Sequence, residues 1–143
     1  MKDKKALTSP CGIDCFNCEI YEENLSKEVA QALQGKYGWP KEEIACKGCR
    51  QQDGKHVHIP QGCSTLDCVK ARGVAFCSDC ADFPCALLAP VADLAAIRPH
   101  NLKVYNLCRI KKLGLERWIA EEAGQTRKKY FMGKFVMGQG QSD

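Results

Sequence analysis

Apolar residues recur every three to four positions in several short stretches, which is the spacing of helices that bury one face. The first such stretch predicts a helix from Glu19 to Gln34, and Gly35 is expected to end it. The apolar residues that share one face of this helix are Tyr21, Leu25, Val29 and Leu33.

Further short helical segments are predicted along the rest of the chain. Pro40 opens a single turn over residues 40–44, a second helix begins within 63–68 and ends at Gly73, and an apolar helix follows Cys85 and ends before Pro99. Two more helices are predicted over 101–113, ended by Gly114, and over 115–123, ended by Gly124. Strand signals are few. The predicted fold is mainly α and irregular, with four to six short helices, little sheet and turns held by metal.

The length of 143 residues fits one domain with an apolar core. We expect a flexible N-terminal tail over residues 1–10, a single cysteine-rich metal-binding domain over 11–126, and a basic and aromatic C-terminal tail over 127–143. The basic run in that tail, Arg127 to Lys129, is interpreted as the solvated end of a helix.

The most unusual feature of the composition is its 11 cysteines. No apolar signal-peptide core follows the basic residues 1–10, and the longest apolar stretch, residues 86–97, is too short to span a membrane. A cytoplasmic protein, with no membrane association, is therefore expected. Reduced compartments do not support disulfides, and many of the cysteines form Cys-x-x-Cys pairs, so the sequence favours metal binding.

One set of four cysteines has the spacing of a closed zinc site. Cys46 and Cys49 form a tight pair around Gly48, and Cys63 and Cys68 stand at the start of a predicted helix. Two ligands on a turn and two on a helix can surround one tetrahedral ion. We therefore predict a structural four-thiolate zinc site at these four residues.

Six further cysteines form two sequence groups of three, and a four-coordinate ion needs only four of them. The preferred ligands are the two Cys-x-x-Cys pairs, Cys15 with Cys18 and Cys77 with Cys80. Cys11 and Cys85 remain alternative or additional ligands. About two zinc ions per chain are expected, and an iron–sulfur cluster or thiol-redox centre on these six residues is the main alternative, since spacing separates zinc from iron–sulfur poorly.

The remaining candidates receive structural interpretations. Cys108 shares a helix face with Val104 and Leu107, which predicts a small buried side chain. His56 and His58 could substitute as metal ligands, but they are assigned to a solvated polar loop between residues 50 and 62. No catalytic triad, phosphate-binding loop or paired carboxylates emerge, so we expect no catalytic residues.

The formal net charge of +4 raises the question of nucleic-acid binding. Eight zinc-bound thiolates lower this charge by eight and two zinc ions raise it by four, so the loaded protein is close to neutral. Nucleic acid is therefore not the expected partner. A zinc-stabilised module that binds an unidentified protein partner is preferred, with a nucleic-acid-binding zinc protein as a further alternative.

The sequence resembles the cysteine-rich family known as domain of unknown function 3795. The shared elements are Cys11-Gly12 with Cys15, Cys18 and Tyr21, then Cys46-x-Gly48-Cys49-Arg50, Cys63, Cys68, Gly73-Val74, and Phe76-Cys77-x-x-Cys80-x-x-Phe83-Pro84-Cys85, with a weaker continuation through Asn101-Leu102, Ile110, Gly114 and Trp118. The resemblance extends over roughly residues 10–123. It implies zinc binding, and the family has no established reaction.

Overall fold

A computed structural model describes residues 3–88 and 98–133, and the statements below concern these residues. Helices α1 (Lys27–Tyr37), α2 (Ser64–Arg72), α3 (Lys103–Leu113), α4 (Leu115–Arg117) and α5 (Ala123–Met132) carry the fold, and a π-helical turn, Trp118–Glu122, joins α4 to α5. Short 3-10 turns lie at Cys15–Asn17, Lys41–Glu43, Cys77–Asp79, Ala86–Leu88 and Pro99–Leu102. Isolated bridges occur, but no strand forms in the described ranges. The prediction of a mainly helical domain is confirmed.

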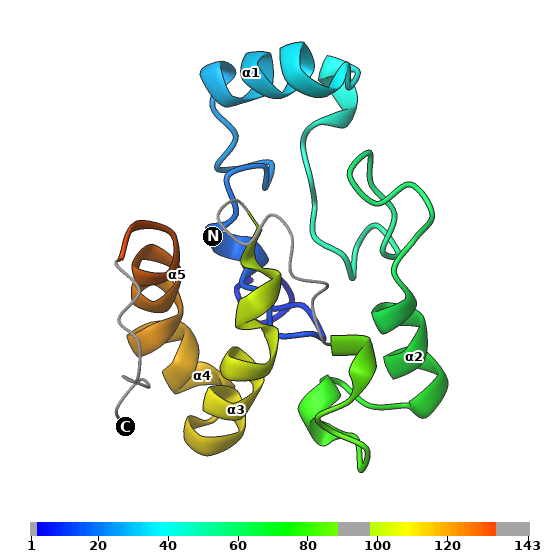
Figure 1. The fold of residues 1–143 in the computed structure, drawn as a ribbon, viewed down its shortest axis with the longest axis vertical. Helices are drawn as coiled ribbons and strands as arrows, with labels where there is room; N and C mark the ends of the chain where they lie inside the picture. The colour runs from blue at the N-terminus through cyan, green and yellow to red at the C-terminus, as the bar shows by residue number, and fades with distance from the viewer. Residues whose placement is uncertain (1–2, 89–97, 134–143) are drawn as a thin grey trace.

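The helices form no layered bundle. Figure 1 shows α3 near the middle, α4 and α5 on one side of it, α2 on the other, and α1 set apart at one end of the molecule. Long irregular segments connect these elements. The helices are therefore held in place by side chains from the loops and from the N-terminal residues.

The first helix lies further along the chain than its apolar pattern predicts. α1 begins after Ser26, whose hydroxyl accepts a hydrogen bond from the Val29 amide (3.1 Å), and it ends at Gly38 (φ 68°). The predicted start at Glu19 and stop at Gly35 are wrong. Residues 18–25 instead form turns fastened to a distant segment, since the Cys46 amide donates to the Ile20 carbonyl (2.7 Å).

The later helices follow the prediction more closely. α2 ends at Gly73 and α3 ends before Gly114, as expected, and Pro40 opens the turn Lys41–Glu43. The predicted helix end at Gly124 is wrong, because Gly124 lies inside α5. A glycine that ends a helix usually has a positive φ, and Gly124 does not. Most of the apolar helix predicted after Cys85 lies outside the described residues.

Two small apolar clusters form the core. The first joins the N-terminal segment to the last helices and contains Leu7, Phe16, Tyr21, Ile110, Trp118 and Ala123. The second joins α2 to α3 and contains Cys11, Leu66, Val69, Cys77, Leu88 and Leu107. Two thiols thus belong to the core itself, and the cysteine-bearing turns lie against it.

Residues 8–14, called here the central segment, hold these parts together. Alternate residues of the segment each accept a hydrogen bond from a different region: Thr8 O from Arg50 Nε (3.1 Å), Pro10 O from the Cys77 amide (2.9 Å), Gly12 O from Asn106 Nδ2 (2.7 Å) and Asp14 Oδ1 from the Arg127 guanidinium (2.8 Å).

The segment is packed accordingly. Thr8, Ser9 and Asp14 are buried, and so is Leu7 just before it. The sequence-based limit at residue 10 falls inside this segment, and the limit at residue 126 falls inside α5. The division of the chain into a domain with two tails stays a prediction. No helix in the described ranges has the length and apolar character needed to cross a bilayer.

Candidate metal centre

Four cysteines between residues 15 and 49 form thiol group A: Cys15, Cys18, Cys46 and Cys49. The thiol of Cys15 donates a hydrogen bond to the sulfur of Cys49. The charge of Cys18 acts on both Cys15 and Cys46, and Cys46 also feels Cys49. Two Cys-x-x-Cys pairs that are separate in sequence therefore lie side by side.

Backbone pairing brings the two halves of group A together. Cys15 opens a 3-10 turn, and the Cys18 amide closes it on the Cys15 carbonyl (3.0 Å). The residues just after this turn then pair with the second half, because Tyr21 and Cys46 form a parallel bridge and the Glu22 amide donates to the Cys46 carbonyl (2.8 Å). The amide of Gly48 points at the sulfur of Cys46 (3.4 Å), an arrangement that favours thiolate.

The four thiols of group A differ in their pKa values. The hydrogen bond to Cys49, followed by burial, raises the pKa of Cys15 well above its usual value. The same hydrogen bond lowers the pKa of Cys49, and the nearby charge of Arg50 adds to this effect. Burial raises the pKa of Cys18 and Cys46. In the metal-free chain, Cys49 is therefore the member that most readily carries the negative charge.

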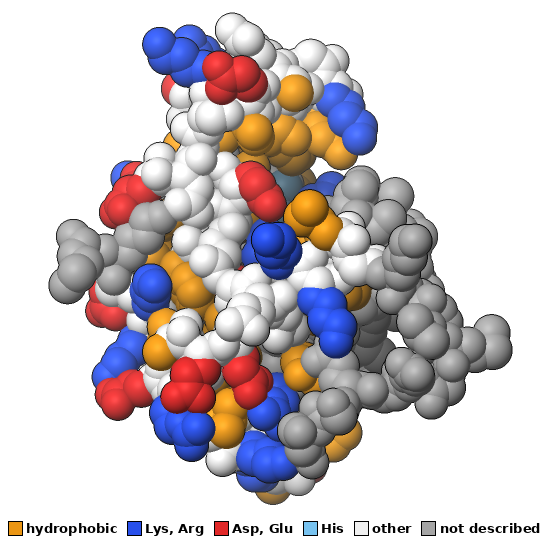
Figure 2. All heavy atoms as spheres, turned by 90° about the vertical axis from the view of Figure 1, so that its left-hand side faces the viewer, with side chains coloured by type: hydrophobic (Ala, Val, Ile, Leu, Met, Phe, Trp, Pro, Cys, Tyr) orange, Lys and Arg blue, Asp and Glu red, His pale blue; other side chains and the backbone are white. Residues whose placement is uncertain are grey.

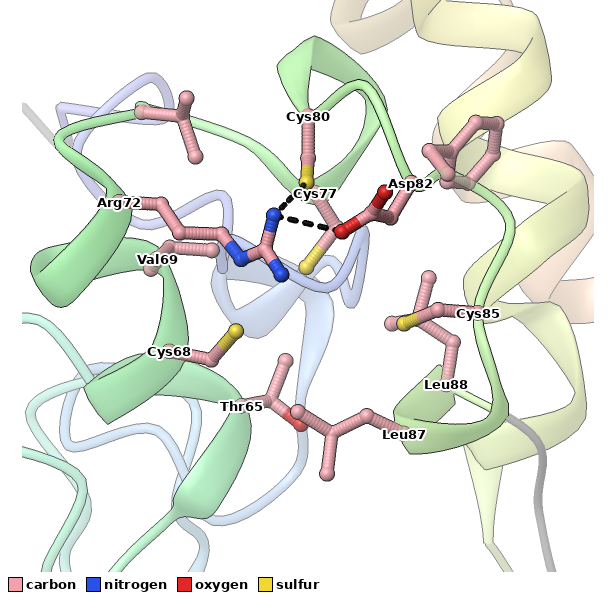
Figure 3. A pocket seen from close by; sticks show the side chains of 12 residues that line it. Thr65, Cys68, Val69, Arg72, Cys77, Cys80, Asp82, Cys85, Leu87 and Leu88 are labelled. Atoms are coloured by element: carbon pink, nitrogen blue, oxygen red, sulfur yellow. Dashed lines mark hydrogen bonds and ion pairs between the residues drawn. The ribbon is translucent and has the colours of Figure 1, made fainter.

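The second group, thiol group B, consists of Cys68, Cys77, Cys80 and Cys85. These residues line one cavity of about 100 Å³ together with apolar side chains of α2 and of the segment 83–88. Figure 3 shows their sulfur atoms on different sides of this cavity: Cys68 extends from α2, Cys77 and Cys80 from the turn Cys77–Asp79 and its end, and Cys85 from the opposite wall.

One arginine covers the group B thiols. The Arg72 guanidinium donates to the Cys80 sulfur (3.2 Å) and forms an ion pair with Asp82 (2.7 Å). Cys68 also acts on Arg72 and helps to raise its pKa. Burial, followed by the charges of neighbouring thiols that include Cys85, raises the pKa of Cys77 to about 12. Uncompensated thiolates would repel one another here, so a cation is needed for the group to ionise fully.

Cys11 lies between the two groups. It is buried, its sulfur is 3.2 Å from the Ser9 hydroxyl, and burial raises its pKa. Its charge interacts with Cys49 in group A and with Cys77 in group B. The central segment therefore places one protonated thiol near both groups.

Two cysteines stand outside both groups. Cys63 precedes α2 and packs with the second core cluster, where its Cβ lies close to Gly54. Cys108 is exposed, so the prediction of a buried core thiol is wrong. The buried face of α3 is formed by Asn106, Leu107 and Ile110, and Cys108 lies beyond its edge.

The proximity of the sulfurs thus differs from the grouping that spacing suggests. Cys46 and Cys49 interact with Cys15 and Cys18, while Cys77 and Cys80 line one cavity with Cys68 and Cys85. As placed, no set of three or more His, Cys, Asp or Glu side chains in the described part of the chain is arranged to hold a metal ion. The assignment of ligands therefore stays a prediction.

Sequence reasoning missed the arginines that accompany the thiols. Arg50 follows Cys49 directly, and Arg72 stands four residues after Cys68 on a helix, so both positions are readable in the sequence. Arg127, interpreted as solvated, is buried. Its charge lowers the pKa of Cys18, although burial has the larger and opposite effect.

The comparisons with known proteins identify one family. The family described as "Protein of unknown function (DUF3795)" matches residues 7–90. The chain belongs to this family. The DUF3795 match includes both thiol groups and Cys11, and it ends before α3, so the weaker resemblance over residues 101–118 lies beyond it. No curated protein and no solved structure matches the chain.

Proposed function

We propose that the protein binds two zinc ions, one in thiol group A and one in thiol group B, and that the two ions stabilise its fold. The observation that carries this proposal is the arrangement of group B, in which four sulfurs from α2, the turn Cys77–Asp79 and the segment before Ala86 surround a single cavity. A donor set of sulfur alone suits zinc among the common divalent ions.

The surroundings of both groups support bound thiolates. A zinc ion with four thiolates carries a net charge of −2, which needs nearby cations or N–H donors. Arg72 supplies both to group B through its contacts with Cys80 and Cys68. In group A, Arg50 lies near Cys49 and the Gly48 amide points at Cys46.

Four protein ligands leave no open position on the ion for water or substrate, so the proposed role of the metal is structural. Structural zinc contributes roughly 10–16 kcal/mol in finger peptides, which is comparable to the whole stability of an ordinary domain. The loop-rich fold has two core clusters instead of one continuous core, so we expect it to depend on this contribution. We propose a binding module whose shape depends on its metal.

Metal content measured by mass spectrometry, after anaerobic purification without a histidine tag, tests the proposal. We expect two zinc ions per chain in the unaltered protein. Cys80→Ser and Cys85→Ser should each lose one ion, whereas Cys63→Ser, the matched control, should keep both. The ligand sets preferred from cysteine spacing predict the opposite: Cys63→Ser should lose one ion, and Cys85→Ser should keep both.

Labelling of the zinc-loaded protein with a thiol reagent gives an independent readout. Cys108 should react fastest because it is exposed and belongs to neither group. Cys85 is also exposed, but it should be protected while zinc is bound and should react once a chelator is added. Stoichiometric iron with acid-labile sulfide, or rapid labelling of Cys85 in protein that contains two zinc ions, would overturn the proposed sites.

A further inference from the structure

A pair of histidines lies outside both thiol groups, in the loop after Cys49. The bridge between His56 and Ile59 folds this loop back, and the imidazole rings of His56 and His58 meet with their centroids 4.4 Å apart. Their Nδ1 atoms face each other in close contact. Both rings are half-buried, so the interpretation of a solvated loop is wrong.

The contacts of His56 indicate which of its nitrogens carries the proton. The backbone N–H of His58 points at Nδ1 of His56 (3.5 Å), which marks Nδ1 as an acceptor. Nε2 of His56 is fully buried and makes no hydrogen bond of normal geometry. The backbone carbonyls of residues 43–45 act on the His56 ring as hydrogen-bond acceptors. Because Nδ1 already accepts from His58, we assign the proton of the ring to Nε2.

With its proton on Nε2, His56 directs the lone pair of Nδ1 toward Nδ1 of His58. Two lone pairs that face each other repel unless a proton or a cation lies between them. Metal-binding histidines commonly show this pattern, with one nitrogen directed at the ion and the other N–H directed at backbone carbonyls. The Glu43 carboxylate also acts on His56 and supplies a negative charge, whereas the charges of Arg98 and His100 act on His58.

We propose that His56 and His58 chelate a divalent transition-metal ion through their Nδ1 atoms, at a site separate from the thiolate groups. Imidazole suits zinc, nickel and copper, and the intrinsic affinity of nitrogen ligands rises from nickel to copper. Two protein ligands leave the other positions of the ion to water. The site therefore takes up metal reversibly and is not one of the structural sites.

The site is open to ions from solution. Figure 2 shows hydrophobic side chains gathered below the end of the molecule that carries α1, with basic side chains next to them. The indole ring of Trp39 lies near the pair, with its centroid 6.5 Å from that of His58, and Tyr37 stacks on Trp39 at 4.6 Å. A paramagnetic ion bound by the two histidines would therefore lie close enough to quench the fluorescence of Trp39. The other tryptophan, Trp118, is fully buried in the first core cluster.

Titration of Ni²⁺ into untagged protein of known zinc content, followed by tryptophan fluorescence, tests this site. We expect saturable quenching at one equivalent, and zinc in excess should compete. His58→Gln and His56→Gln should abolish the saturable phase, while His100→Ala should retain it. Trp39→Phe should lose the fluorescence change but still bind one nickel ion in a calorimetric titration.

Quenching of Trp39 by nickel does not depend on the thiolate sites. A negative result would therefore contradict the histidine site without contradicting the proposed structural zinc sites. Circular dichroism and the melting temperature show whether each variant is folded. Unaltered protein that shows no saturable nickel binding would mean that the two rings share only a hydrogen bond. Quenching that persists in both folded glutamine variants would also overturn the assignment.

Discussion

The guanidinium of Arg127 donates to the carboxylate of Asp14 at 2.8 Å, across 113 residues of sequence. Both side chains are buried, and Arg127 reaches Glu19 as well (3.2 Å). Burial raises the pKa of Asp14, while the charge of Arg127 opposes that shift. The pair fastens α5 to the central segment, next to thiol group A.

Removal of one partner from this pair should be costly. Arg127→Met leaves the Asp14 carboxylate buried with only the Asn17 amide as a side-chain donor, and a broken buried pair costs about 3–5 kcal/mol. Chemical denaturation of zinc-loaded protein measures the change. Lys128→Met, at the exposed neighbouring position, should change the unfolding free energy by less than about 0.5 kcal/mol. Equal effects of the two substitutions would contradict a buried ion pair.

Two glycines should respond in opposite ways to alanine. Gly48 has a φ of 93°, and a Cβ there would lie 3.0 Å from Cδ2 of Leu7, so Gly48→Ala should destabilise the protein by about 1–2 kcal/mol and weaken zinc retention by group A. Gly35 lies inside α1 with open space around it, so Gly35→Ala should stabilise by about 0.5–1 kcal/mol. Thermal unfolding and competition with a zinc chelator give both readouts. A stabilised Gly48→Ala protein would argue against the turn described for residues 46–49.

The contact between Arg109 and Glu122 should give a pH-dependent contribution to stability. Two hydrogen bonds, of 2.8 and 2.6 Å, join the half-buried side chains and lower the pKa of Glu122 from its ordinary value of 4.5. The contribution is therefore complete above the unfolded pKa and is lost as the pH falls through the lower, folded pKa.

Glu122→Gln should reduce stability by about 1 kcal/mol at pH 6, and its difference from the unaltered protein should shrink as the pH falls below 4.5. Urea unfolding at several pH values measures this difference, and titration of the thiolates affects both proteins alike. A difference that grows toward acid pH would contradict the assigned direction of the pKa shift.

Local signals in the sequence predict the later helices well. Gly73 and Gly114 follow α2 and α3, and Pro40 opens a turn, because each of these residues acts through its own backbone. The start of α1 could not be predicted from apolar spacing alone. Tyr21 has the correct spacing for the helix, but it is buried in the first core cluster, and its neighbours pair with Cys46.

The cysteine arrangement depends on contacts that spacing does not encode. Cys-x-x-Cys pairs identify the local turns, and the residues of both thiol groups were all candidates from the sequence. Which pairs lie together depends on the bridge between Tyr21 and Cys46 and on the bond from the Cys77 amide to Pro10, and both join segments far apart in sequence. The contact of the two histidines is local, but it depends on the bridge between His56 and Ile59, which the polar composition of the loop does not indicate.

The central segment also constrains the order in which the chain can complete its fold. During synthesis residues 8–14 emerge early, but their hydrogen-bond partners follow much later in the chain. The donors to Thr8, Gly12 and Asp14 lie 42, 94 and 113 residues further along. Closing such long loops before their contacts form slows folding and leaves apolar groups exposed meanwhile. In a nascent chain that stops before Arg127, the Asp14 carboxylate would therefore still lack its arginine partner, even if the earlier thiols had already bound metal.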